Sequence, residues 1–189
     1  LLDVTNNATI EKAFAEAALA FGGVDIIVNN AGISISKSIT DHSIEDWDKL
    51  YDILVNGQFL VSKLGVEVMR KQVFGGNILN MVSKNSVVAG PNNTGYGSAK
   101  AAQAHLSRLR AAELGGDKLR VNTVNPDAVI AESNIGDGGW AEGRAKAYGS
   151  RVAALQADGH MRTWRNRTRL PADLANSLDA FSGGSTSKP

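Results

Sequence analysis

A tyrosine and a lysine four residues apart form the pair in this sequence best suited to proton transfer. Tyr96 and Lys100 lie in a segment with helical periodicity, and a spacing of four places both side chains on one helix face. A nearby ammonium group favours the phenolate, so in a partly dry site it lowers the pKa of a tyrosine from its usual value of about 10. The pair therefore predicts a tyrosine that exchanges protons near neutral pH, although a chance surface pair has the same spacing.

Three further polar positions follow or interrupt predicted elements. Ser83 follows an apolar run, and its hydroxyl either binds a substrate oxygen held by the tyrosine or caps a turn. The Asn-Asn-Ala-Gly run at residues 29–32 ends another apolar run. Its small residues either let a flat ring or a ribose approach the backbone, or they form a plain turn at the end of a strand. Asn56 precedes Gly57 inside a predicted helix, so it either faces solvent or holds a water through its side chain or a distorted turn.

Alternating helical and strand-like segments must position these groups. The periodicity predicts helices over residues 7–21, 43–71 and 95–114, and strands over 25–28, 77–82 and 119–124. The first two helices have apolar faces formed by Ile10, Phe14, Ala17 and Phe21, and by Ile44, Trp47, Leu50 and Leu54. Ser43, with Asp46 three residues later, resembles a capping box at the start of the second helix. The alternation predicts an α/β fold with a parallel sheet and helices on both faces, whose ligands bind past the carboxyl ends of the strands.

The composition narrows the possible classes of function. A chain of 189 residues with 43% hydrophobic and 21% charged residues is typical of one globular domain and excludes intrinsic disorder. A net charge of +1 gives no basic excess for nucleic acid or an anionic membrane, and no apolar run reaches the length of a membrane span. The absence of cysteine excludes disulfides and thiol catalysis, and the three separated histidines argue against a metal site.

The motifs in their order resemble the short-chain dehydrogenase/reductase family over residues 1–135. That resemblance implies a Rossmann-like fold, NAD or NADP as cofactor, and self-association into a dimer or tetramer in the cytoplasm. It implies a catalytic tetrad of Asn56, Ser83, Tyr96 and Lys100. It further implies cofactor contacts by Asp3, Val4, Asn30, Ala31, Gly32, Tyr96, Lys100, Pro126, Asp127 and Val129. A finer resemblance, in the segments around residues 82–85, 125–130 and 166–168, is to the dehydrogenase half of bifunctional aldolase/short-chain dehydrogenases.

Departures from the family pattern shape the remaining expectations. The family's glycine-rich phosphate loop would precede residue 1 and its last strand would follow residue 189, so we expect a single dehydrogenase domain truncated at both ends. The usual Pro-Gly is Pro126-Asp127, and the usual threonine five residues after the proline is Ala131. The irregular segment 127–160, which contains Trp140 and Tyr148, is predicted to be a substrate lid. A short helix is predicted over 171–181, and the tail 182–189 is rich in serine and glycine.

The expected reaction is hydride transfer between a nicotinamide and a small alcohol, aldehyde or ketone, with Tyr96 as general acid or base. Two alternatives remain open at this point. One is a dinucleotide-binding sensor or structural partner domain without catalysis, which the missing phosphate loop and Asp127 favour. The other is an isomerase or epimerase built on the same tyrosine–lysine pair, although the short chain after Lys100 leaves little room for a sugar-nucleotide domain.

Overall fold

The computed structural model describes residues 1–127. The chain divides into two units, Leu1–Asn125 and Pro126–Pro189, and every element below belongs to the first. Val129, the predicted helix over 171–181, the tail and all but the first residue of the predicted lid lie outside the described residues. No helix within the described part is long and apolar enough to cross a membrane.

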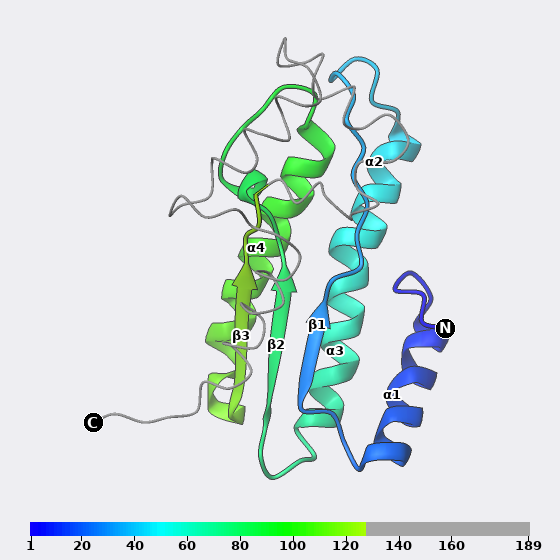
Figure 1. Ribbon diagram of the computed structural model, residues 1–189, viewed down its shortest axis with the longest axis vertical. Helices are drawn as coiled ribbons and strands as arrows, with labels where there is room; N and C mark the ends of the chain where they lie inside the picture. The colour runs from blue at the N-terminus through cyan, green and yellow to red at the C-terminus, as the bar shows by residue number, and fades with distance from the viewer. Residues whose placement is uncertain (128–189) are drawn as a thin grey trace, which may run out of the picture. The chain divides into compact units, whose positions relative to one another are not determined.

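Three parallel strands form one sheet in the order β1-β2-β3 (Figure 1). Val28 of β1 is paired with Leu79 of β2, and Ile78 of β2 with Val121 of β3. The predicted parallel sheet is therefore confirmed, with two strands displaced by one residue from their predicted bounds. The strands are β1 (Ile26–Asn29), β2 (Gly76–Met81) and β3 (Leu119–Val124).

Within residues 1–127, four α-helices accompany the sheet, and local sequence explains where they begin and end. Helix α1 begins after Asn6, whose side chain accepts a hydrogen bond from the backbone of Ala8, and ends at Gly22, which has a φ of 81°. Helix α2 begins after Ser43, whose Oγ accepts from the backbone N–H of Asp46 at 3.1 Å, as the predicted cap requires. The helices are α1 (Asn7–Phe21), α2 (Ile44–Tyr51), α3 (Gly57–Met69) and α4 (Thr94–Leu114).

The single helix predicted over 43–71 is wrong in its middle. A π-helical turn over Asp52–Asn56 separates α2 from α3, and the backbone N–H of Gly57 donates to the carbonyl of Asp52 five residues earlier. Such a turn inserts an extra residue and rotates the following helix, and π-turns are frequent at functional sites. The break falls beside Asn56, so the distorted backbone turn considered for that position is present.

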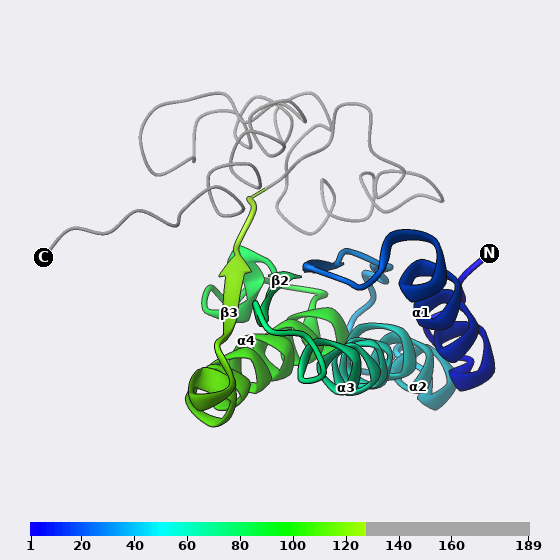
Figure 2. The same cartoon turned by 90° about the horizontal axis from the view of Figure 1, so that it is seen from below.

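Helices α3 and α4 lie on the same side of the strands (Figure 2). Helix α3 contacts β1, α4 contacts β3, and α1 packs against α3. Eight residues from these elements form the main apolar core: Ile10, Ile27, Val61, Val66, Met69, Ile78, Leu114 and Leu119. Two residues predicted for apolar helix faces are instead exposed, because Phe21 ends α1 and Ile44 begins α2.

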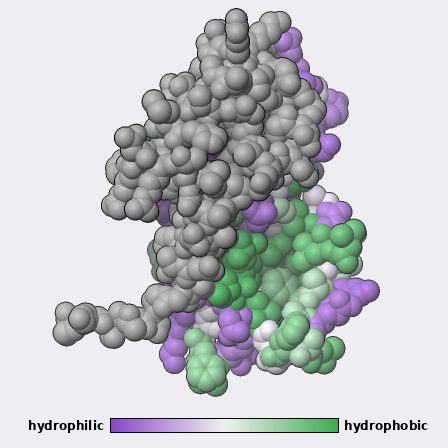
Figure 3. Space-filling view, in the orientation of Figure 1, coloured by the Kyte–Doolittle hydropathy of each residue, from purple (hydrophilic) through white to green (hydrophobic). Residues whose placement is uncertain are grey.

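The other face of the sheet carries exposed apolar side chains. Ile26 and Val28 are 43% and 44% exposed, whereas Ile27 and Asn29 between and after them are buried. Figure 3 shows hydrophobic residues gathered in the part of this view where Figure 1 shows the strands. The helices predicted for this second face are not among residues 1–127.

Candidate active site

The carboxyl ends of the three parallel strands meet at one edge of the sheet, and each is followed by a predicted site segment. Residues 30–32 follow β1, Ser83 lies two residues past β2, and Asn125–Asp127 follow β3. Tyr96 lies in the first turn of α4 and Lys100 in the second. The fold thus brings sequence-distant polar groups to the edge at which parallel sheets bind their ligands.

Tyr96 is buried in a small cluster of its own. Its side chain is 7% exposed and packs with Leu50, Leu54 and Ala99. The cluster is lined by further apolar residues from the β1–α2 segment, the end of α2 and the helix break, namely Ile33, Ile35, Tyr51 and Val55. The phenol therefore lies among apolar side chains from three segments, which is the partly dry setting that the sequence pair requires.

Lys100 is equally buried and lies beside that ring. Its side chain is 6% exposed, its Nζ lies 5.6 Å from the centroid of the Tyr96 ring, and Nζ donates a hydrogen bond of 2.8 Å to the carbonyl of Met81. Burial lowers the pKa of Lys100 from 10.5 to about 8. The amine thus keeps its charge near neutral pH but changes protonation within a range in which enzymes operate.

Ser83 is buried at the start of a short 3₁₀ turn over Lys84–Ser86. Its Oγ accepts a hydrogen bond of 3.2 Å from the backbone N–H of Asn85, which is the capping role considered from the sequence. The turn contacts α4, and a Cβ built on Gly97 would lie 3.5 Å from the carbonyl oxygen of Asn85. The serine therefore occupies the turn that packs next to the residue following Tyr96.

Asn56 closes the π-helical turn and is exposed. Its Nδ2 donates a hydrogen bond of 2.8 Å to Oδ1 of Asp52. The turn contacts both α2 and α4, so Asn56 belongs to the same neighbourhood as Tyr96, whose cluster includes Leu54 from this turn. The side chain of Asn56 thus faces solvent and its backbone lies in a distorted turn, and its binding of a water stays a prediction.

The predicted adenine segment lies against the start of α3. A Cβ built on Gly57 would lie 2.8 Å from Cγ2 of Val4, so the absence of a side chain there permits the contact. Asp3 is exposed, and its Oδ1 accepts hydrogen bonds from the backbone N–H and the side-chain hydroxyl of Thr5. These bonds lower the pKa of the Asp3 carboxyl, and the backbone bond contributes most. Both residues thus lie on a fixed turn, with an ionised carboxylate at the surface.

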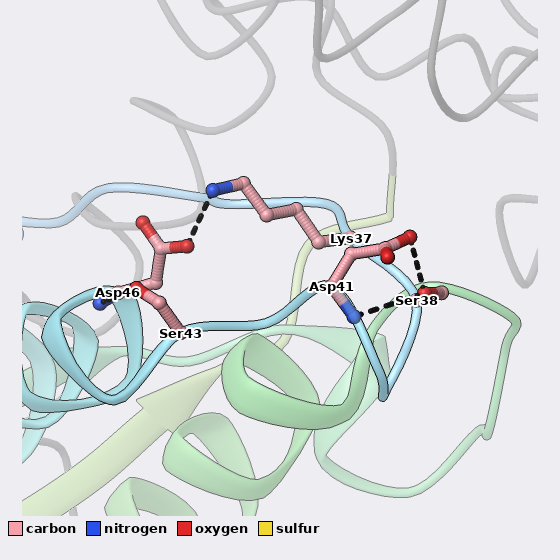
Figure 4. Close-up of polar contacts among 5 residues, drawn as sticks. All are labelled: Lys37, Ser38, Asp41, Ser43 and Asp46. Carbon is pink, nitrogen blue, oxygen red and sulfur yellow. Dashed lines mark hydrogen bonds and ion pairs between the residues drawn. The ribbon is translucent and has the colours of Figure 1, made fainter.

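The segment after β1 begins with Asn30, Ala31 and Gly32, all of which are exposed. A Cβ on Gly32 would lie 3.2 Å from a methyl group of Leu54, so a larger residue would press on the Tyr96 cluster. Farther along, Lys37 pairs with Asp46 at 2.5 Å and Ser38 donates to Asp41 at 2.6 Å, as Figure 4 shows. The Lys37–Asp46 pair ties the segment to the first turn of α2, and the Ser38–Asp41 bond lies within the segment.

Sequence reasoning gave no role to a set of buried polar side chains below the site. Asn80 is fully buried on β2, and Ser62 on α3 and Ser107 on α4 are nearly so. Hydrogen bonds join them to Asn29 and to one another. Polar residues at strand positions and helix faces that should be apolar are the signal that could have indicated them.

Pro126 and Asp127 are half-buried at the end of the described residues. Within residues 1–127, no group of three or more histidines and acidic residues is placed to hold a metal ion. The arrangement can therefore offer a phenol, a buried amine and a hydroxyl to a substrate, together with small exposed residues for a planar ligand.

Comparisons with known proteins show which family this chain resembles. A family model described as enoyl-(acyl carrier protein) reductase matches residues 1–162. The chain is 40% identical over 192 residues to the uncharacterized oxidoreductase YuxG of Bacillus subtilis (strain 168), a match that covers 99% of the chain and 27% of YuxG. It is 36% identical over 126 residues to the NADP-dependent (R)-specific alcohol dehydrogenase of Lentilactobacillus kefiri, covering 66% of the chain and 50% of that enzyme.

A solved structure shows the same fold. Sorbitol-6-phosphate 2-dehydrogenase SrlD from Erwinia amylovora superposes with a TM-score of 0.87 at 21% identity, over 97% of this chain and 71% of SrlD. The chain spans about a quarter of YuxG and half of the alcohol dehydrogenase, so it corresponds to part of each of these relatives.

Proposed function

The chain belongs to the short-chain dehydrogenase/reductase family, and we propose that it carries the catalytic centre of an NAD(P)-dependent oxidoreductase acting on a small alcohol or carbonyl compound. The observation that carries this proposal is the pairing of two buried groups. Lys100, with its pKa lowered to about 8, lies 5.6 Å from the ring centroid of Tyr96 at the carboxyl edge of a parallel sheet. A structural role alone gives no reason to bury an amine beside a phenol, since burial of a charge costs free energy.

Tyr96 is the proposed proton-transfer residue. In oxidation its phenolate takes the hydroxyl proton of the substrate, and in reduction its phenol donates a proton to the substrate oxygen. The ammonium of Lys100 stabilises the phenolate electrostatically, and the apolar residues around the ring strengthen that interaction by excluding water. The hydrogen bond from Lys100 to the Met81 carbonyl fixes the amine in place for this role.

Ser83 and Asn56 are proposed to support the proton transfer. The Ser83 hydroxyl positions the substrate oxygen and stabilises the charge that develops on it. Asn56, at the exposed end of the π-helical turn, holds a water that links Lys100 to solvent. Its Nδ2 already donates one hydrogen bond to Asp52, and its side-chain oxygen Oδ1 is proposed as the acceptor for this water.

The residues present fit a dinucleotide. The exposed backbone of Asn30, Ala31 and Gly32 can accept a flat ring or a ribose, the exposed carboxylate of Asp3 lies near Val4 for the adenine, and Lys100 can bond a ribose hydroxyl. Pro126, Asp127 and Val129 are proposed to meet the nicotinamide. When bound, the nicotinamide supplies the hydride acceptor or donor, and the protein supplies position and electrostatics.

Binding and turnover measured together test this proposal. The protein is titrated with NADH and NADPH and followed by nicotinamide fluorescence, and it is then assayed by nicotinamide absorbance with small alcohols, polyols, aldehydes and ketones. We expect binding of at least one dinucleotide and turnover of at least one substrate class. Dinucleotide binding without turnover on any class would instead favour the sensor, and no binding would contradict both.

Self-association through the outer face of α3 and α4 is part of the same proposal. Phe59 and Leu109 are about half exposed there, and the guanidinium of Arg110 lies 5.9 Å from the Phe59 ring. Both terminal nitrogens of Arg110 are buried, and neither has a hydrogen-bond partner in the described part of the chain. Sedimentation should show a dimer or tetramer that Leu109→Lys weakens, and a monomer would refute it. A cytoplasmic location stays a prediction.

A further inference from the structure

A set of buried hydrogen bonds crosses the core just below the candidate site. Asn29 of β1 donates through Nδ2 to Oδ1 of Asn80 at 2.8 Å and to Oγ of Ser62 at 3.1 Å. Asn80 in turn donates through its own Nδ2 to Oγ of Ser107 at 2.8 Å, and Ser107 donates to the carbonyl of Gln103 at 2.7 Å. Two strands and two helices are thereby joined through side chains alone.

Each member of this set is buried, so its hydrogen bonds decide how the elements fit together. Asn80 has no exposed surface, and Ser62 and Ser107 have almost none. A buried polar atom that loses its partner costs about 1–3 kcal/mol, whereas an apolar contact tolerates a small slide. The Asn80–Ser107 bond therefore fixes the position of α4 along β2. Apolar packing alone would define that position less sharply.

The same strand and helix carry the Lys100 contact. Met81, whose carbonyl accepts from Lys100 Nζ at 2.8 Å, is the residue immediately after Asn80. Lys100 lies seven residues before Ser107 on α4, or about 10 Å along the helix axis. Two hydrogen bonds thus join β2 to α4 in succession. The first is from the Asn80 side chain to Ser107, and the second, closer to the site, is from Lys100 to the Met81 carbonyl.

We propose that Ser107 is a positioning residue, which holds α4 against β2 through Asn80 and so keeps the Lys100 amine on the Met81 carbonyl beside Tyr96. This inference rests on the proposed function only for its catalytic consequence, because the position of the amine is a property of the protein alone. Loss of the Ser107 hydroxyl lets α4 move relative to β2 and lengthens the bond from Lys100 to Met81. The charged form of Lys100 is then less stabilised in a site that stays dry.

The surroundings of Lys100 leave few other groups to set its protonation. Tyr96 faces the amine from α4 itself, and the Met81 carbonyl faces it from β2. Of the elements that contact α4, the 3₁₀ turn carries Lys84, and the π-helical turn carries Asp52, which is exposed and bonded to Asn56. Helix α2 also contacts α4, and it carries Glu45, Asp48 and Lys49, which are exposed, and Asp46, which is paired with Lys37. Burial lowers the pKa of Lys100, whereas a hydrogen bond to the Met81 carbonyl favours the charged amine, so loss of that bond should lower the pKa further.

Two matched serine-to-alanine variants test the proposal. Ser107→Ala removes the bond from Asn80 that joins β2 to α4, together with a long bond of 3.5 Å from Nε2 of Gln58 on α3, whereas Ser62→Ala removes a bond of the same set that reaches α3 only. Protein labelled with ¹³C-lysine is titrated without cofactor or substrate, and the Lys100 signal is identified by its loss in Lys100→Met. We expect a wild-type midpoint at about 8, an unchanged midpoint in Ser62→Ala, and a midpoint lower by about half a unit or more in Ser107→Ala.

Asn80→Leu removes the same bond from the strand side and should shift the midpoint in the same direction. An unchanged midpoint in Ser107→Ala, or equal shifts in Ser107→Ala and Ser62→Ala, would overturn the proposal and leave the set a purely structural one. In the active protein, Ser107→Ala should lower kcat more than it raises KM for the substrate. Because the titration needs no turnover, a failure of the proposed function leaves its outcome interpretable.

Discussion

The two buried clusters of the described unit enclose different kinds of side chain. The larger one, between α1, α3, α4 and the sheet, consists entirely of aliphatic residues and methionine. The smaller one, at the carboxyl edge of the sheet, packs Leu50, Leu54 and Ala99 around the phenol of Tyr96, and Lys100 lies next to it. The first cluster removes apolar surface from water, and the second places a proton donor and a charge in a dry environment.

This difference predicts that the two clusters respond oppositely to substitution. Truncation in the aliphatic core should cost stability and leave the chemistry of each folded molecule intact. Removal of a polar group from the site cluster should cost chemistry and leave stability unchanged or improved, because functional sites hold groups that the fold would otherwise exclude. Four variants test this contrast, from the largest expected effect to the smallest.

Tyr96→Phe should reduce turnover by roughly 10²–10⁴-fold, because it removes the group that transfers the proton while keeping the ring that fills the cluster. The free energy of unfolding, measured in urea, should change by about 1 kcal/mol or less. Tyr51→Phe is the matched control, since Tyr51 borders the same cluster and its ring stacks on Trp47 at 4.6 Å. Turnover of Tyr96→Phe at the level of Tyr51→Phe would contradict the proton-transfer role.

Ile78→Ala should lower the free energy of unfolding by about 2–5 kcal/mol, because Ile78 is fully buried and the deletion leaves a cavity in the aliphatic core. Turnover per folded molecule, corrected for the folded fraction, should stay within about twofold of wild type. A loss of turnover far beyond the folded fraction would mean that the two clusters are coupled. Urea denaturation monitored by circular dichroism, with activity assayed in parallel, distinguishes these outcomes.

Lys100→Met should reduce turnover, by less than Tyr96→Phe does, and yet stabilise the protein at neutral pH. The pKa of Lys100 is about 8 in the folded protein, against 10.5 for the free side chain, so burial of its charge costs about 3 kcal/mol at neutral pH. The Met81 carbonyl loses its donor in this variant, which offsets about 1 kcal/mol of the gain.

The pH dependence of this gain follows from the direction of the shift. Between pH 8 and 10.5 the unfolded chain binds a proton that the folded protein does not, so the free energy of unfolding of the wild type rises with pH. The advantage of Lys100→Met is therefore full below about pH 8 and disappears as the pH rises through this window. Denaturation curves of both proteins across this range measure it, and a parallel pH dependence would contradict a buried charged amine.

The sequence predicts the strands of this fold to within one residue and three of the four helix starts nearly as well. Apolar runs such as Ile26–Val28 end at polar residues and glycines, so their length is visible without a structure. A distorted turn was considered at Asn56, but its π-helical form over Asp52–Asn56 could not be predicted, because a shift of the backbone bond from Gly57 to Asp52 requires no particular residue type. Phe21 and Ile44 were misplaced because helix periodicity does not tell whether a neighbouring element covers the first or last turn.

The candidate site was predictable only in part, for a related reason. Tyr96, Lys100 and Ser83 were identified by residue type and order, and the structure brings their elements to one edge of the sheet. Asn80 and Ser107 were missed because periodicity assigns polar residues to solvent, and nothing in the local sequence reveals that two of them meet inside. The roles of the tetrad and of the cofactor residues stay predictions until turnover is measured.

Gly57→Ala tests the place where the two clusters approach each other, and we expect the smallest effect there. Alanine favours a helix over glycine by about 1 kcal/mol, but its Cβ would lie 2.8 Å from Cγ2, 3.0 Å from Cβ and 3.2 Å from the carbonyl oxygen of Val4. Those contacts include backbone and branched side-chain atoms, so Val4 must move, at a cost of about 1–3 kcal/mol. The free energy of unfolding should therefore fall by about 1 kcal/mol, as measured in urea.

Gly116→Ala is the matched control, because a Cβ there has no neighbour within 4 Å. Its effect should be neutral or stabilising by up to about 1 kcal/mol, since the unfolded chain loses conformational freedom. A displaced Val4 also moves the turn that holds Asp3, so Gly57→Ala should weaken dinucleotide binding while Gly116→Ala leaves it unchanged. If Gly57→Ala instead stabilises the protein like its control, the contact with Val4 does not constrain the helix break. The presence of glycine at position 57 would then have to be explained by the candidate site and not by packing in the core.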